Sequence, residues 1–170
     1  FNIFFIRSHL SACIWDAESR KQEKLRFPGT MELVTGRFPR HSKLFYEWRI
    51  KDRLKKISRS AKPKESFFDD LATSYDKIGD HEKSVQLMKE RFKINKRRYE
   101  TVANLGTFLL HSGKLNEGLG YIKKAIEINP DAHFGREIYQ QYVVEYVLLR
   151  NPNGKPQLPL RKQVVDSSNK

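Results

Sequence analysis

Hydrophobic positions recur at helical spacing through the middle of the chain, between residues 65 and 130. Large apolar residues fall at i, i+3 and i+7, which places them on one face of a helix. This spacing occurs twice, and the second set lies 34 residues after the first. The two sets are Phe68, Leu71 and Tyr75, and then Val102, Leu105 and Leu109. The pattern predicts two successive copies of one helical unit.

Small and helix-terminating residues divide each copy into two helices. Gly79 and Gly113 lie where a first helix should end, because glycine readily takes the left-handed conformation of a helix C-terminus. Pro130 should end the last helix, since the residue before a proline avoids the helical region. We expect helices over 67–78, 81–94, 98–112 and 115–128. Close contacts between them are expected at the small residues Ala72, Ser84, Gly106, Gly118 and Ala125.

Further helices are predicted on both sides of the repeated stretch. Ser42 can cap a helix over 43–59, whose apolar side should consist of Leu44, Phe45, Trp48, Ile50, Leu54 and Ile57. Asp131 is expected to cap a helix that runs to about residue 150 and covers the last apolar face. Its aromatic stripe, Tyr139, Tyr142 and Tyr146, is expected in the core and at the rim of this cap.

The 34-residue period resembles the tetratricopeptide repeat (TPR) family, whose unit is a pair of antiparallel helices. The resemblance implies an all-α, tetratricopeptide-type helical-hairpin solenoid of about two full repeats, 65–98 and 99–132. A helical extension at 14–64 would precede them, and a capping helix at 133–150 and a flexible tail at 151–170 would follow. The departures are Arg91, where the family prefers a small residue, and Lys96, where it usually has proline. They predict a looser or longer second helix in the first repeat.

The basic character of the chain lies in its N-terminal third. The 170 residues carry a formal net charge of +13. Residues 1–64 hold 16 Lys or Arg against 6 Asp or Glu, a net +10, whereas residues 65–130 hold 11 against 10. The repeats are therefore nearly neutral, and attraction for anions is expected only from the part that precedes them.

The leading functional hypothesis is a protein- or peptide-binding scaffold without catalytic activity. In the family that the chain resembles, the first helix of each pair lines a concave groove. The residues here that would face such a groove are Asp69, Thr73, Asp76, Lys77, Ala103, Asn104, Thr107, Leu110, His111, Glu137, Gln141 and Glu145. This surface could hold an extended or helical segment by hydrogen bonds to its backbone.

The carboxylate clamp of chaperone-binding family members is not expected here. Asn104 matches one clamp position, but Asp69, Glu137 and Gln141 occupy positions that should be basic, and Thr73 replaces the other asparagine. An acidic C-terminus would be repelled, because the clamp depends on charge-assisted hydrogen bonds from cationic side chains. The acidic residues suggest a basic or neutral peptide instead.

The alternative hypothesis is binding of nucleic acid or an anionic membrane by the basic helix of residues 43–64. This segment holds nine basic and two acidic residues, and such charges can neutralise phosphates and release counterions. Against this, its aromatic residues cluster at the start, and its charges form no clean stripe. A solvated face on a basic protein is the plainer explanation.

Enzymatic and cofactor-dependent functions find little support. The sequence contains neither a glycine-rich phosphate loop nor a nucleophile elbow. The five histidines are His9, His41, His81, His111 and His133. Since no two of them are three or four residues apart, no metal site or other cofactor is expected. A hydrolase assembled from His133, Arg136 and Glu137 is a third and weaker hypothesis.

The N-terminal segment 1–13 is apolar at first and ends in Leu10-Ser11-Ala12-Cys13, which resembles a bacterial lipobox. A lipobox would make Cys13 a lipidation site and favour an exported or periplasmic protein over a cytoplasmic one. Arg7 and His9 interrupt the apolar segment, so a buried N-terminal element with a small buried cysteine is the alternative. Cys13-x-Trp15-Asp16, with later Pro28-Gly29, is similar to the start of uncharacterised, exported bacterial TPR proteins. No apolar run reaches the roughly 18 residues of a membrane span.

Overall fold

The computed structural model describes residues 41–149, apart from the side chains of residues 133 and 134. Within this part the chain is entirely helical and has no strand. Its elements are α3 (Lys43–Ser58), α4 (Glu65–Lys77), α5 (His81–Ile94), α6 (Tyr99–His111), α7 (Leu115–Ile128), the 3₁₀ helix η2 (Ala132–Gly135) and α8 (Arg136–Leu148). The predictions for 1–13 with Cys13, for residues 14–40 and for the tail 151–170 lie outside the described residues.

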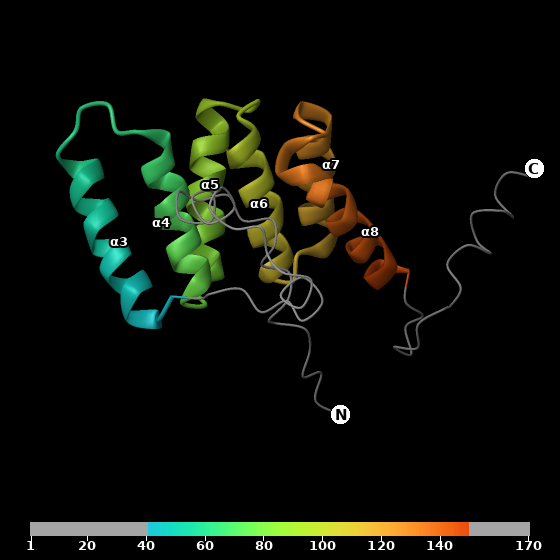
Figure 1. The fold of residues 1–170 in the computed structure, drawn as a ribbon, viewed down its shortest axis with the longest axis horizontal. Coiled ribbons are helices and arrows are strands. Elements are labelled where there is room, and N and C mark those ends of the chain that lie inside the picture. The colour runs from blue at the N-terminus through green and yellow to red at the C-terminus, as the bar shows by residue number, and fades with distance from the viewer. Residues whose placement is uncertain (1–40, 150–170) are drawn as a thin grey trace, which may run out of the picture.

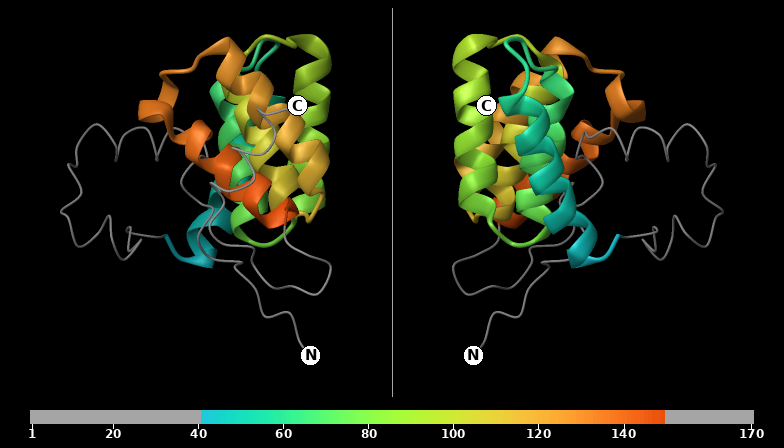
Figure 2. Two further views of the ribbon diagram at one scale, coloured as in Figure 1. Left: turned by 90° about the vertical axis from the view of Figure 1, so that its right-hand side faces the viewer. Right: turned by 90° about the vertical axis from the view of Figure 1, so that its left-hand side faces the viewer.

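The helices stand side by side in a row that follows their order in the chain, as Figure 1 shows. Each α-helix packs against its neighbour in sequence, and α4 also packs directly on α6. Figure 2 presents the same array from its two ends. We call α4, α6 and α8 the A helices. Helices α5 and α7, which follow α4 and α6, are the B helices. The predicted all-α fold of packed helix pairs is therefore present.

The turns that join an A helix to its B helix are alike in both copies. Gly79 and Gly113 have φ angles of 92° and 82°, in the left-handed region where glycine avoids a steric penalty. In each copy the residue after the glycine donates its backbone N–H to the carbonyl oxygen five residues earlier. Asp80 donates to Tyr75 and Lys114 to Leu109, both at 2.9 Å. The prediction that these glycines end the first helices is confirmed.

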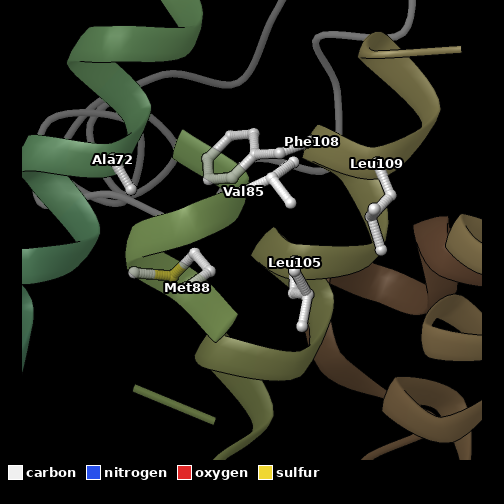
Figure 3. Close-up of a cluster of buried hydrophobic side chains, with 6 residues drawn as sticks. All are labelled: Ala72, Val85, Met88, Leu105, Phe108 and Leu109. Carbon is white, nitrogen blue, oxygen red and sulfur yellow. The ribbon is translucent and has the colours of Figure 1, made fainter. Parts of the chain in front are cut away.

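One buried apolar cluster of the core lies between α4, α5 and α6. Figure 3 shows its six fully shielded side chains, which come from all three helices: Ala72, Val85, Met88, Leu105, Phe108 and Leu109. The larger of them come from α5 and α6, while α4 contributes an alanine where it packs. This burial of apolar surface supplies the main driving force for docking the first repeat on the second.

Two glycines allow α6 and α7 to approach closely. A Cβ atom at Gly118 would lie 2.6 Å from Leu110 Cδ2 and 2.9 Å from the carbonyl oxygen of Gly106. A Cβ atom at Gly106 would lie 2.8 Å from Ile122 Cδ1. The predicted close contact at both glycines is therefore confirmed.

Helix α3 begins as predicted but buries a different face. The Ser42 Oγ accepts a hydrogen bond from the Phe45 N–H at 3.3 Å, so the predicted N-cap is correct. The predicted apolar side is wrong in part, because Leu44, Trp48 and Leu54 are exposed and the buried residue is Arg49. The reason is that α4 presents hydrogen-bonding groups to α3, and cationic side chains satisfy them.

The C-terminal helix also differs from the prediction. The segment after Asp131 forms η2 first, and α8 starts only after Gly135, whose φ of 72° interrupts the helical path. Asp131 is therefore not the cap of α8. Tyr139 and Tyr142 are 68% and 59% exposed rather than in the core, which leaves an apolar face on the last helix.

Arg91 does not lengthen the second helix of the first repeat, so that part of the prediction is wrong. Helices α5 and α7 both have 14 residues. The Arg91 guanidinium lies 4.1 Å from the centre of the Phe68 ring and pairs with the Glu65 carboxylate. A long side chain fits at position 91 because it extends out of the contact between α4 and α5, and its end covers the edge of α4.

Replacing Gly118 with alanine should destabilise the fold, because the added methyl group meets backbone as well as side-chain atoms. We expect the free energy of unfolding to fall by about 1–3 kcal/mol. The matched control is Gly120→Ala in the same helix, where a Cβ would meet nothing within 4 Å. That substitution should stabilise by about 0.5–1 kcal/mol through helix propensity. Urea unfolding of both variants measures the difference, and equal stabilities would show that the close approach is absent.

Candidate functional site

Most of the residues predicted to face a peptide groove are buried. Lys77, His111, Gln141 and Glu145 are partly exposed. The other eight are at most 5% exposed: Asp69, Thr73, Asp76, Ala103, Asn104, Thr107, Leu110 and Glu137. Much of the predicted face therefore consists of side chains shielded from water, and only its half-exposed members are directly accessible.

Several of these buried polar residues join neighbouring A helices. Arg98, which precedes α6, donates hydrogen bonds to both carboxylate oxygens of Asp69 in α4, at 2.8 and 2.6 Å. It also donates to the Thr101 Oγ1 at 2.8 Å. Burial raises the pKa of Asp69 to about 6, although the hydrogen bonds and charge of Arg98 oppose the shift.

Polar contacts also connect α6 with α8. The Gln140 amide donates to the Thr107 Oγ1 at 3.3 Å, and the Tyr99 hydroxyl donates to the Glu137 carboxylate. Each contact gives a buried side chain, Thr107 or Glu137, a hydrogen-bond partner in place of water. The row of A helices thus continues through α8.

A third polar cluster joins three helices at the end of the array where α4 and α6 finish. Asp76 lies near the end of α4, His81 is the first residue of α5, and His111 is the last residue of α6. Both histidine Nδ1 atoms lie 2.8 Å from the Asp76 Oδ1, and the His111 Nδ1 is also 3.0 Å from Oδ2. The two imidazole rings are 5.9 Å apart and nearly perpendicular.

The carboxylate of Asp76 is anionic in this setting. Burial raises the pKa of Asp76, but the hydrogen bonds and charges of His111 and His81 outweigh that effect and hold the pKa below its usual value. Two imidazoles and one carboxylate form a donor set that could hold a metal ion.

Sequence reasoning missed this cluster because its histidines are 30 residues apart. The expectation of no metal-ligand group rested on local spacing alone. One signal could have found it. The repeat period aligns His111 with Lys77, which is next to Asp76. The predicted helix over 81–94 starts with His81, directly after the short turn that follows Asp76. The period therefore places residues 76, 81 and 111 close together.

The basic residues of α3 divide between two faces. Arg49 donates to the Ser74 Oγ at 2.7 Å, and Arg53 donates to the Asp70 Oδ2 at 2.8 Å. On the other side Lys51, Lys55 and Arg59 are exposed at i, i+4 and i+8. Arg49 and Arg53, which blur the charge pattern in the sequence, therefore face α4.

The hydrolase hypothesis gains nothing from the structure. Glu137 is buried and accepts the hydrogen bond from Tyr99. Arg136 is partly exposed, and the side chain of His133 lies outside the described part.

A comparison with protein-family models gave no match, and neither did a comparison with curated proteins. Among residues 41–149, every helix is too short or too polar to cross a lipid bilayer.

The raised pKa of Asp69 predicts a pH dependence of stability. The native state binds a proton at Asp69 more tightly than the unfolded chain does, whose pKa is near 3.8. The free energy of unfolding should therefore fall as the pH rises from 4 to 6, by up to about 3 kcal/mol. Asp69→Asn removes this titration. Urea unfolding of both proteins between pH 4 and 7 measures it, and a difference that is constant with pH would contradict the shift.

Proposed function

We propose that the chain is a tetratricopeptide-type helical-hairpin scaffold that binds a protein or peptide and does not catalyse a reaction. One observation carries the proposal: the A helices form a continuous row, α4 on α6 by direct packing and α6 on α8 by side-chain hydrogen bonds. In the family that the sequence resembles, such a row is the wall of the peptide-binding groove. The two turns with left-handed glycines 34 residues apart support the same assignment.

The accessible part of the proposed surface lies at the C-terminal ends of α4 and α6 and on α8. Lys77, His111, Gln141 and Glu145 are all partly exposed there. Gln141 donates to Glu145 at 2.9 Å, and Glu145 pairs with Lys123 at 2.9 Å. Amide, imidazole and carboxylate groups suit hydrogen bonds to a peptide backbone, and the carboxylate favours a basic or neutral peptide over an acidic one.

The exposed face of α8 supports a role in protein contact. Tyr139, Tyr142 and Val143 are 68%, 59% and 46% exposed. Tyrosine is enriched at protein interfaces because its ring buries a large area and its hydroxyl can still form a hydrogen bond.

The combined variant Lys77→Ala, Gln141→Ala and Glu145→Ala should weaken partner binding at least about tenfold, since each lost hydrogen bond contributes about 0.5–1.5 kcal/mol. The partner is first isolated with the intact protein and its contact mapped by cross-linking to α4, α6 or α8. Binding of the purified partner to both proteins is then measured by calorimetry.

The matched control replaces three exposed residues of the B helices with alanine: Lys93, Asn116 and Glu127. This control should bind as the unmodified protein does. Equal affinities of the two triple variants would contradict a binding surface on the A helices.

A second candidate function is anion binding by α3, and the exposed stripe Lys51, Lys55 and Arg59 is the observation that favours it. If these residues neutralise phosphates, replacing all three with glutamate should reduce the slope of log affinity against log salt for duplex DNA by about 3. Vesicles rich in phosphatidylserine test the membrane alternative in a parallel titration.

The control for this experiment carries the same change in net charge at another exposed site: Lys93→Glu, Lys96→Glu and Arg97→Glu. It should leave the slope for duplex DNA and the affinity for vesicles close to those of the unmodified protein. A protein that binds neither DNA nor vesicles at low salt would eliminate this second function.

A further inference from the structure

We propose that Asp76, His81 and His111 form a binding site for a divalent transition-metal ion, with zinc the best fit. The site is independent of the proposed peptide-binding function, although His111 belongs to both surfaces. Each of the three residues offers one ligand atom, and these atoms all lie within 4.8 Å of one another. They come from three different helices, so the fold itself brings them together.

The distances between the ligand atoms are close to those of a metal site. Zinc binds imidazole nitrogen and carboxylate oxygen at about 2.0–2.2 Å, so two ligands at a tetrahedral angle lie about 3.3 Å apart. Each Nδ1 lies 2.8 Å from the Asp76 Oδ1. An increase of about half an ångström in each Nδ1–Oδ1 distance would admit the ion. Small rotations of the side chains can provide this increase.

The chemistry of the donor set selects the metal. Imidazole nitrogens suit zinc and its first-row neighbours, whereas calcium and magnesium prefer sites made of oxygen alone. Both histidines would bind through Nδ1, which requires the proton of each neutral ring to be on Nε2. Asp76 supplies a buried anionic oxygen that offsets part of the charge of the ion.

Access to the site is adequate for an ion with an open coordination position. The side chains of His81 and His111 are 24% and 16% exposed, whereas that of Asp76 is 3% exposed. Among the described residues, no fourth His, Cys, Asp or Glu joins the group. Water would therefore complete a tetrahedral shell from the solvent side.

A bound ion would fasten the two repeats together. Asp76 and His81 flank the turn of the first repeat at Gly79, and His111 precedes the turn of the second at Gly113. A ligand that binds the folded state stabilises it. The ion would therefore resist separation of α4 and α5 from α6.

The competing explanation is a purely structural cluster in which both imidazoles donate hydrogen bonds to Asp76. It accounts for the same distances without a metal. The two explanations differ in one measurable property, because only a metal site changes the stability of the protein when zinc is added.

The test titrates zinc chloride into the full chain, with Cys13→Ser in every sample to remove the thiol. We expect one ion per chain by calorimetry and mass spectrometry of the metal. Zinc at about 100 times its dissociation constant should raise Tm by roughly 10 °C. Cobalt(II) in place of zinc should give the visible absorption of a tetrahedral ion.

His81→Gln and His111→Gln should each weaken zinc binding at least about tenfold and reduce the rise in Tm. His41→Gln is the matched control and should behave as the unmodified chain, because His41 is not a member of the ligand group and stacks on Phe45. Circular dichroism checks that each variant folds. The proposal is overturned if zinc leaves Tm unchanged, or if the glutamine variants at 81 and 111 bind zinc as tightly as the control.

Discussion

The fold depends on the burial of α6 on all sides. Residues 101–110 are all shielded from water, and this stretch is the most apolar of the described helices. A helix without a solvent-facing side needs neighbours around its whole circumference. Helices α4 and α5 pack against one side and α7 against the other, while α8 is joined to it by hydrogen bonds. The array is therefore cooperative, because removing any neighbour would expose part of α6 to water.

Three buried carboxylates of α4 pair with cationic or imidazole side chains from other parts of the chain. Asp69, Asp70 and Asp76 of α4 are each at most 5% exposed. Asp69 pairs with Arg98, Asp70 with Arg53, and Asp76 with the two histidines. Transferring a carboxylate from water is unfavourable unless it is paired, so each pair fixes how α4 meets a particular neighbour. Removing one partner of such a pair is strongly destabilising, because it leaves a buried charge without compensation.

The same pairing accounts for the difference between the predicted and the observed surface. A polar residue on the face of a helix opposite its apolar stripe is expected to contact water. In this chain many of those residues contact the next A helix instead, because the A helices lie close enough for their side chains to form hydrogen bonds. The accessible positions are then Lys77 and His111 at the ends of α4 and α6, and Gln141 and Glu145 on α8.

The order of the helices and the turns between the A and B helices could be predicted from the sequence alone. The signals were the periodic apolar residues, Gly79, Gly113 and Pro130. The apolar residues act through burial on one helix face, and the glycines and the proline act through local conformation. Both effects depend on positions that are close together in the sequence. Which polar residues meet could not be predicted in this way, because it depends on how the helices pack. Arg98 reaches Asp69 across 29 positions, and His111 reaches Asp76 across 35. The outward face of α8 and the buried face of α3 were decided in the same way, because burial depends on what packs against a helix, and the partner is remote in sequence.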